Sequence, residues 1–84
     1  MDKRHHDTLT NRLEEVLNLG CSHIYWSELY LWYDAGKIAA RTYRDIEERW
    51  QEVSGGHKGQ LQMVQSPAGM FIFSEKSVRP VCDD

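Results

Sequence analysis

Side chains able to do acid–base or metal chemistry occur in close pairs: His5 with His6, Glu14 with Glu15, Cys21 with His23, and Glu47 with Glu48. Adjacent carboxylates on a helix point to different sides, so neither glutamate pair converges on one substrate. The gap between the cysteine and the histidine is shorter than the spacing of paired zinc ligands. The sequence also has no serine nucleophile elbow and no glycine-rich phosphate loop before a helix. We therefore expect no enzymatic activity, no metal and no cofactor.

The side chains best suited to bind a ligand are arginines in the segment that begins near Ala40. Apolar residues recur there at intervals of three and four, which predicts a helix with one side in the core: Tyr43, Ile46, Trp50 and Val53. The outer side carries Arg41 and Arg44 in its first turns. Alternatively, Arg41 with Asp45 and Arg44 with Glu48 form ordinary surface ion pairs, as Asp45 does with Arg49, each contributing about 0.2–0.5 kcal/mol.

Two further helices are predicted before this one. Asp7 or Thr8 caps the first, Gly20 ends it, and its apolar face is Leu9, Leu13, Val16 and Leu17. The connector 21–26 has the composition of an extended segment, and Ser27 with Glu28 starts a second, strongly aromatic helix. Gly36 is expected to end it in the left-handed conformation, with Ile38 folding back on its apolar side.

A β-hairpin is predicted after the third helix. Residues 60–65 and 70–74 flank Pro67-Ala68-Gly69, which suits a type I turn closed by a glycine with positive φ. This three-residue loop pairs Val64 with Ile72 and Met63 with Phe73. The face of the hairpin expected to pack on the helices then carries Leu61, Met63, Phe71 and Phe73. The opposite face carries Val64, Met70 and Ile72, and either the tail from Val78 to Val81 covers it or it binds a partner.

Length and charge limit the class of protein. A chain of 84 residues makes a single domain, 1–84, in which we expect 1–6 to be disordered and 54–59 and 79–84 to be flexible. The predicted core is Leu13, Leu17, Leu29, Tyr43, Ile46 and Trp50. The formal charge of −3 argues against a general polyanion binder, although a local basic patch can still bind nucleic acid. With no membrane-length apolar run, no secretory signal, and free thiols expected at Cys21 and Cys82, a cytoplasmic protein is predicted.

Three helices followed by a hairpin resemble the element order of winged helix-turn-helix domains, from Leu9 to Ser74. The resemblance implies an α+β fold, a third helix that enters the major groove of duplex DNA, and a role in transcription regulation. Arg41, Thr42 and Arg44 would then reach base edges, while Lys58 and Lys76 on the wing would contact phosphates. A homodimer is expected, because one module of this size buries little DNA surface.

A second class of function is a protein-binding module, such as an accessory or inhibitory protein of a phage or plasmid. Tyr25, Trp26 and Tyr30 would form its contact surface together with the hairpin, since aromatic side chains are enriched in interfaces. The same aromatic residues would also serve core packing in a chain that is poor in aliphatic side chains. These alternatives remain open at the level of the sequence.

Overall fold

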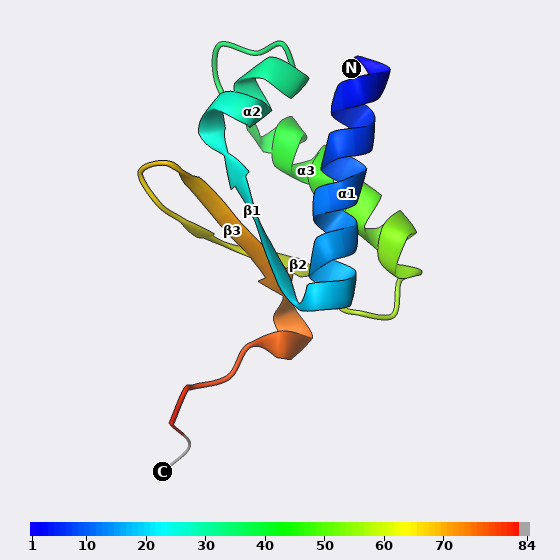
Figure 1. Cartoon of the computed structure of the whole chain (residues 1–84), viewed down its shortest axis with the longest axis vertical. Helices are drawn as coiled ribbons and strands as arrows, with labels where there is room; N and C mark the ends of the chain where they lie inside the picture. Colours follow the sequence, from blue (N-terminus) through cyan, green and yellow to red (C-terminus); the bar gives the residue numbers. More distant parts are fainter. Residues whose placement is uncertain (83–84) are drawn as a thin grey trace.

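Three helices cover one face of a three-stranded antiparallel sheet in the computed structural model, which describes residues 1–82 (Figure 1). The strand order is β1-β3-β2. The elements in chain order are α1 (Lys3–Leu19), β1 (Cys21–Tyr25), α2 (Trp26–Trp32), α3 (Ala40–Ser54), β2 (Leu61–Gln65), β3 (Gly69–Ser74) and a short 3-10 turn (Glu75–Ser77). The predicted α+β fold of three helices followed by a hairpin is confirmed, and the extended connector is the third strand, β1.

α1 begins earlier than the sequence suggested. Asp2 is its N-cap and accepts a hydrogen bond from the Arg4 backbone N–H at 2.8 Å. The predicted start at Asp7 or Thr8 is therefore wrong, and residues 3–6, which we expected to be disordered, form the first turn. Gly20 ends the helix with a φ of 99°, as predicted.

The connection from α2 to α3 also differs from the prediction. α2 ends at Trp32, and the residue with positive φ is Asp34 (48°), whereas Gly36 is not left-handed. Aspartate tolerates this conformation better than most residues with a side chain. Ile38 packs against the core, as the pattern indicated.

The hairpin register is shifted by one residue from the predicted one. Met63 lies opposite Ile72 and Val64 opposite Phe71. The Ser66 backbone N–H donates to the Gly69 carbonyl at 2.8 Å, so only Pro67 and Ala68 lie between the paired residues. The predicted three-residue loop is therefore wrong.

This shift reverses the two faces of β3, because neighbouring side chains of a strand point to opposite sides. Met70 and Ile72 face the helices and are buried, whereas Phe71 is 49% exposed on the outer face. Leu61 and Met63 of β2 lie on the helix side, as predicted, but their neighbours there are Met70 and Ile72 in place of Phe71 and Phe73. The tail does not cover the outer face, since Val78 and Val81 are themselves exposed.

Gly69 is required by the close approach of β1. A Cβ atom on this residue would lie 2.2 Å from the Ile24 carbonyl oxygen and 2.8 Å from the Tyr25 Cα. Its φ is not positive, so the predicted role of Gly69 in the turn is wrong. Any side chain here would push β1 away from β3.

The core lies between the helices and the inner face of the sheet. Its fully buried members are Leu9, Leu13, Val16, Ile24, Leu29, Trp32, Ile46, Trp50, Met70 and Ile72. Of the predicted core, Leu17 and Tyr43 are only partly buried and pack against this cluster. Trp50 is completely buried, and its indole N–H donates to the Gly59 carbonyl at 2.9 Å. It therefore holds the loop after α3 as well as the core.

We expect Trp50→Ala to lower the free energy of unfolding by about 3–5 kcal/mol, because it removes the largest buried side chain and leaves a cavity. Chemical denaturation followed by circular dichroism measures this loss. Trp50→Phe keeps most of the ring and should be clearly less damaging. A Trp50→Ala protein that unfolds cooperatively at the wild-type denaturant concentration would contradict this packing.

Candidate nucleic-acid interface

The N-terminal half of α3 presents two arginines to solvent. Arg41 and Arg44 are both exposed, and no acidic residue occupies the first turn of this helix. Ala39 is an extended N-cap without a side-chain cap bond, so no carboxylate offsets the positive end of the helix dipole. The helix therefore begins as a region of positive potential.

The arginines do not form the ion pairs that their spacing allowed. Within residues 1–82, the structure contains no hydrogen bond or ion pair from the side chain of Arg41 or Arg44. The pair between Arg49 and Asp45 is confirmed, with Nε 2.8 Å from the carboxylate. The alternative interpretation of the sequence therefore holds for this pair and fails for the two outer arginines.

Asp45 is held away from Arg41 by a network that joins the helices. Tyr33, just after α2, donates its hydroxyl to Asp45 at 2.7 Å, and Arg49 in turn contacts His6 of α1. Partial burial of Asp45 opposes its ionisation, but the hydrogen bonds from Arg49 and Tyr33 outweigh it and hold its pKa below the usual value. Burial and the bond to Asp45 raise the pKa of Tyr33.

Glu47 is likewise turned toward the protein. Its carboxylate accepts hydrogen bonds from the Leu61 backbone N–H at 3.0 Å and from Gln51 Nε2 at 2.7 Å. The carboxylate of Glu47 therefore serves to fix the hairpin beside α3. Glu48 is exposed and is the acidic residue of this region that faces solvent.

Thr42 does not lie with the arginines. Thr42 is only 4% exposed, and it shares the buried side of α3 with Ile46 and Trp50. It is therefore not placed to reach a base edge. Lys37 is an exposed cation that the sequence reasoning missed, and it lines a shallow pocket with Arg41 at the start of α3. We call Lys37, Arg41 and Arg44 the basic cluster.

Lys58 and Lys76 lie at the other end of the fold. Both are exposed, and Lys76 Nζ donates to the His57 carbonyl at 3.1 Å. The bond from Trp50 to Gly59 places this loop beside the last turns of α3. With a rise of about 1.5 Å per residue, Arg44 and the end of α3 at Ser54 are about 15 Å apart along the helix. The structure therefore separates these two lysines from the basic cluster.

The predicted aromatic surface is also divided. Trp26 is half-buried and holds the hairpin tip, with its indole N–H on the Ser66 carbonyl at 2.9 Å. Tyr25 is 52% exposed on the outer face of the sheet, where it contacts the ring of His23. Tyr30 instead lines a pocket on the helix side together with Trp26 and Lys37. The structure thus brings Trp26 and Tyr30 together and leaves Tyr25 on the other face of the sheet.

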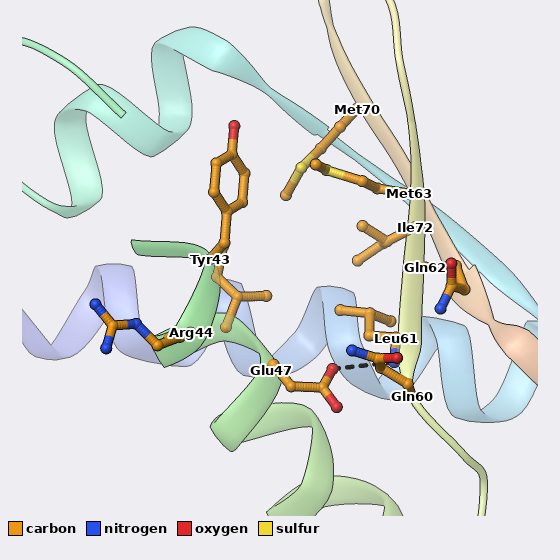
Figure 2. Close-up of a pocket in the computed structure, with 10 residues that line it drawn as sticks. Tyr43, Arg44, Glu47, Gln60, Leu61, Gln62, Met63, Met70 and Ile72 are labelled. Atoms are coloured by element: carbon orange, nitrogen blue, oxygen red, sulfur yellow. Dashed lines mark hydrogen bonds between the residues drawn. The ribbon is translucent and has the colours of Figure 1, made fainter. Parts of the chain in front are cut away.

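A groove of about 260 Å³ runs between α3 and β2. Figure 2 shows Tyr43 and Arg44 on its helix side and Leu61 and Met63 on its strand side. Met70 and Ile72 form its base. The bond between Glu47 and the Leu61 N–H closes one end, so the groove opens toward the hairpin tip.

Comparison of the chain with protein-family models, curated proteins and solved structures found no match. Among residues 1–82, no helix combines the length and apolar character needed to cross a membrane. The same residues contain no group of three or more histidine, cysteine or acidic side chains placed to hold a metal ion. Cys21 and Cys82 are free and exposed.

The Asp45 network predicts a pH dependence of stability. The folded-state pKa of Asp45 is lower than that of the unfolded chain, so its ionised form stabilises the fold at neutral pH. This contribution is lost as the pH falls through the folded-state pKa, below about 4. Asp45→Asn should therefore lose stability at neutral pH and vary less between about pH 7 and about pH 3 than wild type does.

Urea denaturation across this pH range measures the effect. Glu48→Gln is the matched control, because it removes an exposed carboxylate of the same helix. Among residues 1–82, no side chain or backbone group bonds to this carboxylate. The free energy of unfolding of this control should equal that of wild type at each pH. An Asp45→Asn protein with the wild-type pH profile would show that the network does not stabilise the fold.

Proposed function

We propose that this chain is a winged-helix DNA-binding protein, a non-enzymatic transcription regulator that places the N-terminal half of α3 in the major groove. The observation that carries the proposal is the pair of exposed arginines, Arg41 and Arg44, with no ion-pair partner among residues 1–82. Guanidinium groups in this position suit bidentate bonds to guanine or bonds to phosphate oxygens. Lys37 adds a phosphate contact beside them.

The acidic residues of α3 are compatible with this role because of where their carboxylates point. Asp45 is bonded to Arg49 and Tyr33, and Glu47 is bonded to the hairpin backbone and Gln51. Repulsion of DNA phosphates is therefore weaker than the sequence alone suggests, because Arg49 directly compensates Asp45. The formal charge of −3 belongs to the whole chain, and a local basic cluster can still bind nucleic acid.

The hairpin supports the proposal through its position. Trp26 fixes its tip to the start of α2, and Glu47 fixes its other end to α3. The tip residues Ser66, Pro67 and Ala68 carry no charge, so this wing would position the helix and add polar contacts through Gln65. The main electrostatic attraction then comes from the basic cluster.

Two further properties follow from the proposal. With about three phosphate or base contacts from cations per module, specific binding needs two modules, which we propose to be a homodimer on two half-sites about one helical turn apart. We also propose a cytoplasmic location, because two free, exposed thiols suit a reducing compartment.

Arg41→Ala combined with Arg44→Ala should abolish detectable DNA binding, with at least about a tenfold loss per arginine if binding is still measurable. The dependence of log affinity on log salt should become shallower by about two per module. Fluorescence anisotropy with labelled duplexes selected from pooled genomic fragments measures both effects, and circular dichroism verifies the fold.

Lys58→Ala combined with Lys76→Ala is the matched control, because it removes the same charge from the distant end of the hairpin. Its affinity should stay within about twofold of wild type. The proposal would be contradicted if the wild-type protein binds no duplex. It would also be contradicted if the affinity changes neither with the arginine substitutions nor with the salt concentration.

A protein-binding role is the second candidate, and one observation favours it. The shifted hairpin register exposes apolar side chains on the outer face of the sheet, with Tyr25, Val64 and Phe71 each about half exposed. This face would contact a protein partner or serve as the homodimer contact. It lies on the opposite side of the sheet from α3.

If the outer face is a contact surface, Phe71→Ser should convert a self-associating wild type into a monomer without unfolding it. Met70→Ser is the matched control, because Met70 is adjacent but buried, and it should destabilise the fold by about 2–5 kcal/mol. Sedimentation velocity and thermal melts measure the two effects. Equal destabilisation by both substitutions would contradict the register, and a wild type that is always monomeric would exclude self-association through this face.

A further inference from the structure

The hydrogen-bond pattern of the hairpin shows which backbone groups of β2 are left at the edge of the sheet. The Ser66 N–H donates to Gly69, and the Glu75 N–H donates to Gln60, so these two pairs are hydrogen-bonded. Bonded and non-bonded pairs alternate in an antiparallel ladder. Between them, Gln62 and Val64 therefore bond to β3, while the N–H and C=O groups of Leu61, Met63 and Gln65 point away from it.

The opposite edge of the sheet, along β1, is closed by side chains. Arg12 donates to the His23 carbonyl at 2.7 Å, and Glu28 accepts from the Tyr25 N–H at 3.0 Å. Arg12 and Glu28 also form a bidentate ion pair with distances of 2.9 and 2.7 Å. α1 thus covers this edge, which is a usual protection against unwanted strand pairing.

The β2 edge has this protection at one end only. The Leu61 N–H donates to Glu47, whereas no residue from 1 to 82 provides a hydrogen-bond partner for the outward N–H of Met63 or Gln65. Met63 is 40% exposed. An open strand edge therefore lies at the mouth of the groove between α3 and β2.

The groove beside this edge suits alternating apolar side chains. Its apolar lining includes Tyr43, Leu61, Met63 and Ile72, and Tyr43 also lines the neighbouring pocket that contains Lys37 and Gln65. A chain that leaves the groove past Gln65 thus arrives at an exposed cation. The closed end of the groove carries the negative charge of Glu47. The two ends therefore differ in charge, which favours one orientation of a bound segment.

We propose that β2 is a strand-addition site that binds an extended, apolar segment of a partner protein with an acidic residue at the end that passes Gln65. The segment would bond to the outward N–H and C=O groups of Met63 and Gln65 and insert every second side chain into the groove. Its acidic residue would pair with Lys37.

A second copy of the chain fits this edge less well in the register centred on Met63, which would use the outward groups of all three residues, Leu61, Met63 and Gln65. Antiparallel pairing of two β2 strands about a two-fold axis at Met63 would place Gln65 of one copy opposite Leu61 of the other. The Leu61 N–H is already taken by Glu47, which projects from α3 at that position. A separate peptide has no such constraint, because it can stop before the closed end.

This inference does not rest on the proposed DNA binding. The strand site depends on the backbone of Met63, the DNA proposal depends on the side chains of Arg41 and Arg44, and Lys37 adds a charge contact in both. Met63→Pro should therefore leave DNA binding intact, and Arg41→Ala, which changes a side chain outside the groove, should weaken DNA binding and leave peptide binding intact. Each proposal can fail without the other.

The test uses a short synthetic peptide of alternating valine and serine with glutamates at both ends, and a matched peptide with lysines in their place. Fluorescence anisotropy measures binding to the full chain. Hydrogen exchange followed by NMR measures protection of single amides. We expect the acidic peptide to bind, and the Met63 and Gln65 amides to gain at least about tenfold protection while those of Gln62 and Val64 stay unchanged.

Three variants complete the experiment. Met63→Pro removes the outward N–H without breaking a bond to β3, and should weaken peptide binding at least about tenfold. Lys37→Glu should reverse the preference between the acidic and lysine peptides. Lys58→Glu makes the same charge change at the far end of the hairpin and should not alter that preference. If Met63→Pro does not fold, the protection pattern in wild type decides alone.

Several outcomes would overturn the proposal. These are the absence of binding at millimolar peptide, binding without protection of the Met63 and Gln65 amides, and equal binding of both peptides to wild type. A dimer that forms without peptide and is lost in Met63→Pro would show that a second copy occupies the edge instead.

Discussion

The hydrogen bond from the Leu61 backbone N–H to the Glu47 carboxylate joins α3 directly to the first residue of the hairpin. A bond to a charged acceptor contributes about 1.5–3 kcal/mol, which is a large part of the stability of a domain of this size. The bond has three structural consequences. It closes one end of the β2 edge and one end of the groove, and it turns a negative charge of α3 toward the sheet. Without it, the hairpin would be attached to the helices through its inner face, through Trp26 at the tip and through the bond from Trp50 to Gly59 just before β2.

The charged side chains of α3 differ in whether they bond to the rest of the protein. Asp45 accepts hydrogen bonds from Tyr33 of the preceding segment and from Arg49 of α3 itself, and Arg49 in turn contacts His6 of α1, so this acid helps to join the three helical segments. The first two turns of α3 keep their arginines without such partners among residues 1–82. A helix stabilised only by surface pairs would show the reverse arrangement, with each arginine bonded to the acid four residues further on. The contacts of Asp45 with Tyr33 and Arg49 therefore leave Arg41 without the ion pair that its spacing from Asp45 allowed.

The sequence was sufficient to predict the three helices, the buried helix residues Leu13, Leu29, Ile46 and Trp50, and the exposure of Arg41 and Arg44, because a 3.6-residue apolar period marks the buried side of a helix. It was not sufficient for the hairpin register. Met70, Phe71, Ile72 and Phe73 are all apolar, so alternation could not show which side of β3 faces the helices, and the turn Ser66-Pro67-Ala68-Gly69 accommodates two loop lengths. Thr42 was misplaced for a related reason: it continues the buried series of Ile46 and Trp50 at a spacing of four, but a threonine does not signal burial. The roles of Asp2 and Lys37 depend on local backbone geometry that no periodicity encodes.

The two proposed ligands of this fold share Lys37 and the region where α3 approaches the hairpin. A peptide that adds to β2 would neutralise one of the three cations of the basic cluster and occupy the space between the helix and the wing. By linkage, each ligand would then weaken the other by the same factor, and this coupling would need no change of conformation. The electrostatic part alone is equivalent to removing about one cation–phosphate interaction per module, and steric exclusion from the groove adds to it. In such an arrangement the open edge of β2 would regulate DNA binding through direct competition, because the groove and the basic cluster meet at the start of α3.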